Sequence, residues 1–201
     1  LAQVSGRFRH KLTHAKADFP ATGDFVMIEP LPGEPKAVIQ AVLPRHTKLS
    51  RTTAGRTTDE QVLASNIDRV FIAVSLGGLL RMRTIERYLT VARDSGAEPI
   101  LLLTKADLSD HIPESLEQVH ELAGETPAIP VSSLCAIGLS EVSALIPKGC
   151  TAVILGPSGV GKSTLINALI GEELLPTVPV REHDQKGRHT TTGREMVLIP
   201  R

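Results

Sequence analysis

The sequence predicts an α/β fold in which a P-loop nucleotide-binding domain follows a small all-β barrel. From residue 67 onward, apolar runs of strand length alternate with helical segments, a pattern typical of a parallel sheet covered on both faces. Residues 1–50 instead contain short strands separated by turns with Pro and Gly. Residues 156–163 fit the pattern G-x-x-x-x-G-K-[ST], which binds phosphate between a strand and a helix.

The first 50 residues predict an OB-like β-barrel that is incomplete. Strands are expected over residues 4–10, 25–28 and 36–43, with a proline-rich hairpin loop at 30–35. An OB-fold has five strands, so the three strands visible in the pattern make only a partial barrel.

The first part of the chain carries an excess of positive charge. Residues 1–58 contain 9 Lys and Arg against 4 Asp and Glu, although the whole chain has 22 of each. This basic domain, with the basic segment 45–51, fits contact with a polyanion such as nucleic acid. An ordinary solvated surface explains the same charges equally well. Residues 51–66, which are polar and contain Gly55, are expected to link the two domains.

Residues 67–201 predict the nucleotide-binding domain. The expected strands are 70–74, 99–103, 128–131, 151–155 and 195–199, and the expected helices are 83–95, 113–122, 139–146 and 163–170. Gly96 and Gly171 follow two of these helices, in the position where a left-handed residue ends a helix.

Composition excludes several classes of protein. Hydrophobic residues make up 41% of the 201 residues and aromatic residues only 2%, so the core must be aliphatic. No apolar run approaches the roughly 20 residues that span a bilayer. The two cysteines, Cys135 and Cys150, are in no paired ligand motif and predict free thiols in a reducing, cytoplasmic environment. The chain begins at Leu1, so we expect its true N-terminus to be missing.

The stretch that follows the strand 151–155 has the chemistry of a phosphate-binding loop. Its glycines allow successive backbone N–H groups to converge on an anion, and the next helix presents its positive end. We expect Lys162 to reach the β- and γ-phosphates and the Ser163 hydroxyl to bind Mg²⁺. The predicted phosphate-contacting residues are Gly156, Pro157, Ser158, Gly159, Val160, Gly161, Lys162, Ser163 and Thr164.

A second motif directly follows the predicted strand 99–103. Thr104, Lys105, Ala106 and Asp107 resemble the Asn-Lys-x-Asp motif with which GTPases recognise guanine. A carboxylate at Asp107 can accept hydrogen bonds from N1–H and the 2-amino group of guanine, whereas adenine offers no matching donors. The stem of Lys105 can cover the base. Thr104 replaces the usual Asn, so part of the amide's hydrogen bonding is lost. Ser132 and Ser133, after the next strand, resemble the loop that closes on guanine.

The order of these motifs is permuted. In most GTPases the P-loop comes first, whereas here the guanine motif and Ser132–Ser133 precede it. In this order the chain resembles the circularly permuted, ribosome-small-subunit-dependent GTPases of late 30S maturation. The resemblance also rests on the stretches 23–24, 43–51, 60–68, 85–89 and 187–192.

The resemblance implies a function and further site residues. It implies GTP binding and hydrolysis with GTP/GDP and Mg²⁺, stimulated by the 30S subunit, and a barrel that contacts ribosomal RNA. In the first switch at 187–192, Thr191 would bind Mg²⁺ and the γ-phosphate, and His189 would orient the attacking water. It implies a cytoplasmic protein that contacts no membrane, and we expect a monomer.

Two elements that the family has are not found in the sequence. A strand ending in Asp-x-x-Gly, the second switch, does not follow residues 195–199, and two cysteines cannot build the family's zinc domain. We therefore expect a fragment, with zinc only in the missing part, and poor hydrolysis. Two alternatives stay open: a P-loop ATPase or nucleotide kinase, which would leave Asp107 unexplained, and an RNA-binding module without efficient hydrolysis.

Overall fold

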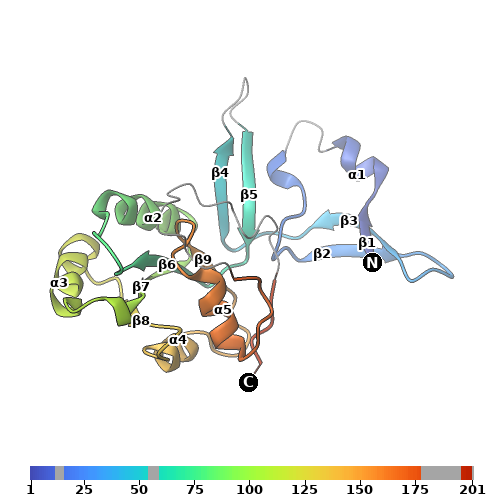
Figure 1. Cartoon of the computed structure of the whole chain (residues 1–201). Helices are drawn as coiled ribbons and strands as arrows, with labels where there is room; N and C mark the ends of the chain where they lie inside the picture. Colours follow the sequence, from blue (N-terminus) through green and yellow to red (C-terminus); the bar gives the residue numbers. More distant parts are fainter. Residues whose placement is uncertain (12–15, 54–58, 178–195, 201) are drawn as a thin grey trace. The chain divides into compact units, whose positions relative to one another are not determined.

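The computed structural model describes residues 1–11, 16–53, 59–177 and 196–200 (Figure 1). The chain forms two compact units, Leu1–Ile67 and Asp68–Arg201. None of the helices in the described ranges has both the length and the apolar content needed to cross a bilayer.

The first unit contains five strands in two sheets. Strand β1 is parallel to β3 and β2 is antiparallel to it, while β4 and β5 form a separate antiparallel pair. The strands are β1 (Ala2–Val4), β2 (Val26–Pro30), β3 (Ala37–Val42), β4 (Lys48–Thr53) and β5 (Asp59–Ser65), with a short helix α1 (Gly6–Lys11) and a 3₁₀ turn η1 (Lys16–Asp18). Within the described residues these sheets do not close into one barrel.

Two predictions made from the sequence differ from the structure of the first unit. The strand predicted over residues 4–10 ends at Val4, because the Ser5 hydroxyl accepts a hydrogen bond from the Phe8 N–H at 2.9 Å and caps α1. The linker predicted over 51–66 is largely the paired strands β4 and β5. Leu49 of β4 and Val62 of β5 are buried in this pair of strands. The segment is mostly polar, so its composition does not indicate the pairing.

A buried ion pair joins the ends of three strands in the first unit. Asp24 precedes β2, Arg45 follows β3, and Ser65 ends β5. Arg45 donates from Nε to Asp24 Oδ1 and from Nη2 to Oδ2, both at 2.7 Å, and the Ser65 hydroxyl donates to Oδ1 at 2.5 Å. The Ala21 N–H donates to Oδ2 at 2.7 Å. Gly23 has φ 93°, and a Cβ there would lie against the Ser65 carbonyl oxygen.

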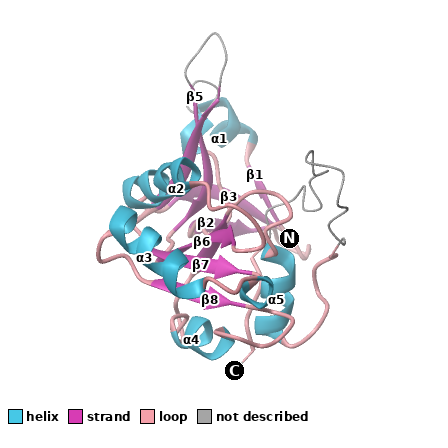
Figure 2. Cartoon of the chain, turned by 60° about the vertical axis from the view of Figure 1, so that its left-hand side comes forward, coloured by secondary structure: helices cyan, strands magenta, loops and turns pink. Residues whose placement is uncertain are grey.

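The second unit is built on a four-stranded parallel sheet with the order β8-β7-β6-β9. Figure 2 shows β8, β7 and β6 side by side. Continuous apolar sequences form these strands, as predicted, because both faces are buried. They are β6 (Arg69–Ser75), β7 (Glu98–Thr104), β8 (Ala128–Val131) and β9 (Ala152–Leu155). The chain proceeds outward from β6 to β8 and then returns to pair β9 with the other side of β6. The strand order therefore reverses between β6 and β9.

Helices cover both faces of this sheet. They are α2 (Met82–Asp94), α3 (Ile112–Ala123), α4 (Leu139–Ala144) and α5 (Lys162–Ile170). On one face Phe71, Ile100 and Leu102 pack with Val142 of α4 and Leu165 of α5. Helices α2 and α3 lie on the other face (Figure 2). The predicted aliphatic core and all four predicted helices are confirmed.

The strand predicted over residues 195–199 does not form in its described part. Residues 196–200 have no regular secondary structure, and the side chain of Leu198 is 87% exposed. No described strand lies beside this segment, and an apolar stretch without a sheet neighbour has no backbone partners for a ladder.

Candidate nucleotide-binding site

The three predicted motifs lie at one edge of the parallel sheet. The P-loop follows β9, Thr104–Asp107 begins at the end of β7, and Ser132–Ser133 follows β8. Since parallel strands share the edge where their carboxyl ends lie, the fold brings together motifs separated by up to 60 residues. The reversal between β6 and β9 is the position at which open α/β sheets bind ligands.

Backbone geometry makes the P-loop a tight turn. Gly156, Gly159 and Gly161 have φ values of 153°, 75° and 100°. A Cβ at Gly156 would lie 2.6 Å from the Ala73 carbonyl oxygen of β6, so the close approach of loop and strand requires glycine. Gly161 is the N-cap of α5, whose first turn contains no acidic residue. Free N–H groups and the positive helix end therefore face the loop.

Lys162 provides the charge of this loop. Its Nζ donates to the carbonyl oxygens of Gly156 at 3.0 Å and Pro157 at 2.7 Å. Burial lowers the pKa of Lys162. Ser163 and Thr164 follow in the first turn of α5 and are half-buried, while Pro157, Ser158 and Gly159 are exposed. These donors fit phosphate groups, and the Ser163 hydroxyl fits as one Mg²⁺ ligand beside them.

Thr104 connects the end of β7 to the P-loop. Its Oγ1 lies 2.7 Å from the Val160 carbonyl oxygen and 3.1 Å from the Val74 carbonyl oxygen of β6. Its own carbonyl oxygen accepts a hydrogen bond from the Leu76 N–H at 2.8 Å. The side chain is buried, and sequence reasoning gave no sign of its contact with Val160.

The residues after Thr104 turn sharply. Lys105 has φ 58° and ψ 41°, the left-handed conformation, and Ala106–Leu108 form a 3₁₀ turn, η2. This geometry leaves Asp107 exposed, so its carboxylate is accessible to a ligand. The stem of Lys105 passes close to Gly77, where an added Cβ would lie 3.5 Å from Lys105 Cδ.

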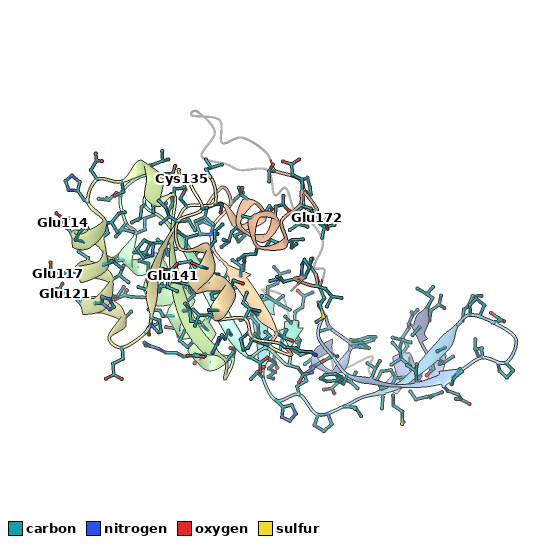
Figure 3. All side chains as sticks on the ribbon, turned by 90° about the horizontal axis from the view of Figure 1, so that it is seen from below. Glu114, Glu117, Glu121, Cys135, Glu141 and Glu172 are labelled. Carbon is teal, nitrogen blue, oxygen red and sulfur yellow. The ribbon has the colours of Figure 1, made fainter. Side chains whose placement is uncertain are left out.

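The loop after β8 is closed by its own hydrogen bonds. Ser132 and Ile137 exchange two backbone hydrogen bonds at 3.0 Å, and the Ser132 hydroxyl accepts one from the Cys135 N–H at 3.2 Å. Ser132 is buried and shapes the loop, whereas Ser133 is half-buried and Cys135 is exposed (Figure 3).

A residue that sequence reasoning missed is Asn167. It is buried on α5, and its amide donates to the Leu175 carbonyl oxygen and accepts from the Leu175 N–H, both at 2.8 Å. The signal was available, because Asn167 is a lone polar residue among the apolar positions in the second half of α5.

His189 and Thr191 lie outside the described residues. The described ranges contain no group of three or more His, Cys, Asp or Glu side chains that could hold a metal ion.

The sheet order and the order of its loops define a circularly permuted P-loop GTPase fold. The family model described as RsgA GTPase matches residues 42–201. This chain therefore belongs to the RsgA GTPase family.

Curated relatives agree with this assignment. The small ribosomal subunit biogenesis GTPase RsgA of Methanosarcina acetivorans is 44% identical over 181 residues, which are 90% of this chain and 49% of that protein. The protein named small ribosomal subunit biogenesis GTPase RsgA 2 of Lactiplantibacillus plantarum is 41% identical over 199 residues, 99% of this chain and 56% of that protein. The chain thus spans about half the length of the curated relatives it matches.

Solved structures agree on the fold. YjeQ from Thermotoga maritima has a TM-score of 0.64 and 26% identity, with 84% of this chain and 55% of that chain covered. YloQ, described as a circularly permuted GTPase, has a TM-score of 0.58 over 84% of this chain and 54% of its own, and at 18% identity it shows the fold alone.

Proposed function

We propose that this chain binds and hydrolyses GTP as part of a small ribosomal subunit biogenesis GTPase. The observation that carries the proposal is the junction of the two ligand loops: the Thr104 hydroxyl lies 2.7 Å from the Val160 carbonyl oxygen. A guanine-reading sequence and a phosphate-binding loop thus share one edge of the sheet. The names of the curated relatives support the biological process.

Each described residue has a chemical task in this proposal. The P-loop N–H groups and Lys162 hold the phosphates, and Ser163 supplies a hydroxyl ligand to Mg²⁺. Asp107 accepts hydrogen bonds from guanine, and the Lys105 stem covers one face of the base. Ser132 and Ser133 shape the loop that closes the base site. Mg²⁺, if held by the Ser163 hydroxyl, would supply positive charge against the negative charge of the phosphates.

Hydrolysis needs an in-line water and little covalent chemistry from the protein. We assign the orientation of this water to His189, and a contact with Mg²⁺ and the γ-phosphate to Thr191. The first unit, with its excess of basic residues, is the part that we assign to ribosomal RNA, and the 30S subunit is the proposed partner in the cytoplasm.

Competitive binding tests the base assignment. GDP, a GTP analogue and ADP are titrated with Mg²⁺ against the wild-type chain, Asp107→Asn and the control Asp110→Asn, an exposed aspartate three residues away. Guanine nucleotides should win over ADP by at least about a hundredfold in the wild type and in the control, because adenine would cover the Asp107 carboxylate without offering it the N–H donors that guanine has. Asp107→Asn should lose this preference and gain affinity for xanthosine diphosphate, because the C2 oxygen of xanthine can accept a hydrogen bond from the new amide.

Equal affinity for ADP and GDP in the wild-type chain would refute the guanine assignment and favour an ATPase. The rate of GTP hydrolysis, measured with and without 30S subunits, then tests the proposed role in biogenesis of the small ribosomal subunit. An RNA-binding module without efficient hydrolysis would bind RNA equally well with and without nucleotide and release no phosphate.

A further inference from the structure

We infer that the loop after β6, residues 75–78, is a further element of the base site, and that Gly77 in this loop is a positioning residue. The inference rests on the proposed function, in which the stem of Lys105 covers the base and Asp107 reads its edge. It adds a residue that acts on the base through Lys105. The argument concerns the loop after β6 and the base-reading loop, residues 104–109.

The first step is how the two loops are joined. Strands β6 and β7 pair in parallel up to Ser75 and Thr104. The pairing continues for one more residue, because the Leu76 N–H donates to the Thr104 carbonyl oxygen at 2.8 Å. The Ser75 hydroxyl then accepts a hydrogen bond from the Gly77 N–H at 3.2 Å. These two bonds hold Gly77 beside the start of the base-reading loop.

The second step is what lies against Gly77. A Cβ added there would lie 3.3 Å from Leu108 Cδ1, 3.4 Å from Ser75 Oγ and 3.5 Å from Lys105 Cδ. Two of these three atoms belong to the base-reading loop, and one of them is in the stem of Lys105. The space beside Gly77 therefore accepts a Cβ only tightly, and a larger side chain has to displace the side chains of Leu108 and Lys105.

The third step is why Lys105 is sensitive to this crowding. Its backbone has φ 58° and ψ 41°, and its carbonyl oxygen accepts a hydrogen bond from the Leu108 N–H at 3.0 Å. A residue with a Cβ has only a small allowed region of φ and ψ in this left-handed conformation. The backbone of Lys105 cannot follow a displaced stem, so the side chain has to change its rotamer and leave the face of the base.

The fourth step is the consequence for different ligands. In the proposed site the Lys105 stem covers the base, whereas the P-loop after β9 holds the phosphates. Crowding at Gly77 should therefore weaken guanosine and GDP in the same proportion and leave pyrophosphate unchanged. A residue that only stabilised the fold would weaken all three ligands together.

The experiment measures three ligands on the wild type, Gly77→Val and the matched control Gly78→Val. Neither glycine has a positive φ, and a Cβ at Gly78 has no atom within 4 Å. In Gly77→Val, guanosine and Mg²⁺-GDP should bind about tenfold more weakly, because overpacking costs this much, while Mg²⁺-pyrophosphate changes by less than about twofold. Gly78→Val should leave the affinity for all three ligands within about twofold of the wild type.

A rescue variant tests whether crowding is the cause. Leu108 is 65% exposed, so Leu108→Ala removes the atom nearest to the added Cβ at little cost to the fold. The double variant Gly77→Val with Leu108→Ala should bind guanosine and GDP within about threefold of Leu108→Ala alone, because contacting residues have non-additive effects.

Three results would overturn the inference. These are unchanged guanosine and GDP affinity in Gly77→Val, equal weakening of all three ligands, and no rescue by Leu108→Ala. Should Gly77→Val not fold, Gly77→Ala decides: weaker guanosine and GDP binding with unchanged pyrophosphate supports the inference, and unchanged binding of all three ligands refutes it. Equal affinity of the wild type for GDP and ADP would refute the proposed function, whereas a preference for GDP together with an unaffected Gly77→Val would refute this inference alone.

Discussion

Replacing Asp24 by Asn should destabilise the first unit by about 3 kcal/mol. Its side chain is 1% exposed, that of Arg45 is 13% exposed, and two hydrogen bonds of 2.7 Å join them. Asn retains one acceptor oxygen but removes the charge, and it leaves a mostly buried guanidinium without its counterion. Removing one partner of a buried pair costs about 3–5 kcal/mol, and the retained acceptor places this substitution at the lower end.

Amide hydrogen exchange followed by mass spectrometry measures this effect unit by unit. A loss of about 3 kcal/mol corresponds to exchange roughly a hundredfold faster in peptides of Leu1–Ile67, with no change in Asp68–Arg201. The matched control is Glu34→Gln, which removes an ion pair whose side chains are both 51% exposed and should cost less than about 0.5 kcal/mol. Equal exchange rates in the two variants would refute the reasoning.

The same ion pair makes the first unit sensitive to acid. Burial alone would raise the pKa of Asp24, but hydrogen bonds from Arg45, Ser65 and the Ala21 N–H outweigh it and hold the pKa below the ordinary value of 3.8. A lowered pKa in the folded state contributes stability above pH 3.8, and this contribution is lost as pH falls below it toward the folded-state value. In Asp24→Asn the acid-induced loss over this range should be smaller.

Two further predictions concern the second unit. Asn167→Ala leaves the N–H and C=O of Leu175 without their partners and should lower the free energy of unfolding by about 1–3 kcal/mol, measured in urea. The exposed control Gln118→Ala should lower it by less than about 0.5 kcal/mol. Equal unfolding midpoints for the two variants would contradict this prediction. Mg²⁺-GDP, but not ADP, should slow the alkylation of the exposed Cys135. Alkylation of Cys150, which precedes β9 at the opposite edge of the sheet, should not change with either nucleotide. Equal protection of both thiols would contradict a base site beside Cys135.

The parallel sheet could be predicted because its strands are apolar on both faces, so the sequences at 70–74 and 99–103 are continuous and unmistakable. The first unit was harder, because its strands are only partly buried. At 4–10 the hydroxyl of Ser5 decides between strand and helix, and that single hydrogen bond has no periodic signal. At 51–66 the polar residues hide a hairpin in which Val62 of β5 lies opposite Ser50 of β4.

The site divides in the same way. The P-loop residues could be found from sequence because phosphate binding fixes both the glycines and Lys162 at constant spacing. The contact of Thr104 with Val160 joins residues 56 positions apart and depends on which strands are neighbours, so no local pattern contains it.

The pairing of β9 with β6 also determines when this protein can first hold a nucleotide. Arg69 pairs with Ala152, more than 80 positions later, whereas β7 pairs with β6 after a much shorter excursion of the chain. Closing the longer loop costs more entropy, and non-local pairing slows folding. The base-reading half of the unit can assemble while the chain is still emerging, and the phosphate-binding half must wait for β9. Binding of a nucleotide that spans both halves is therefore a readout of completed folding of the second unit.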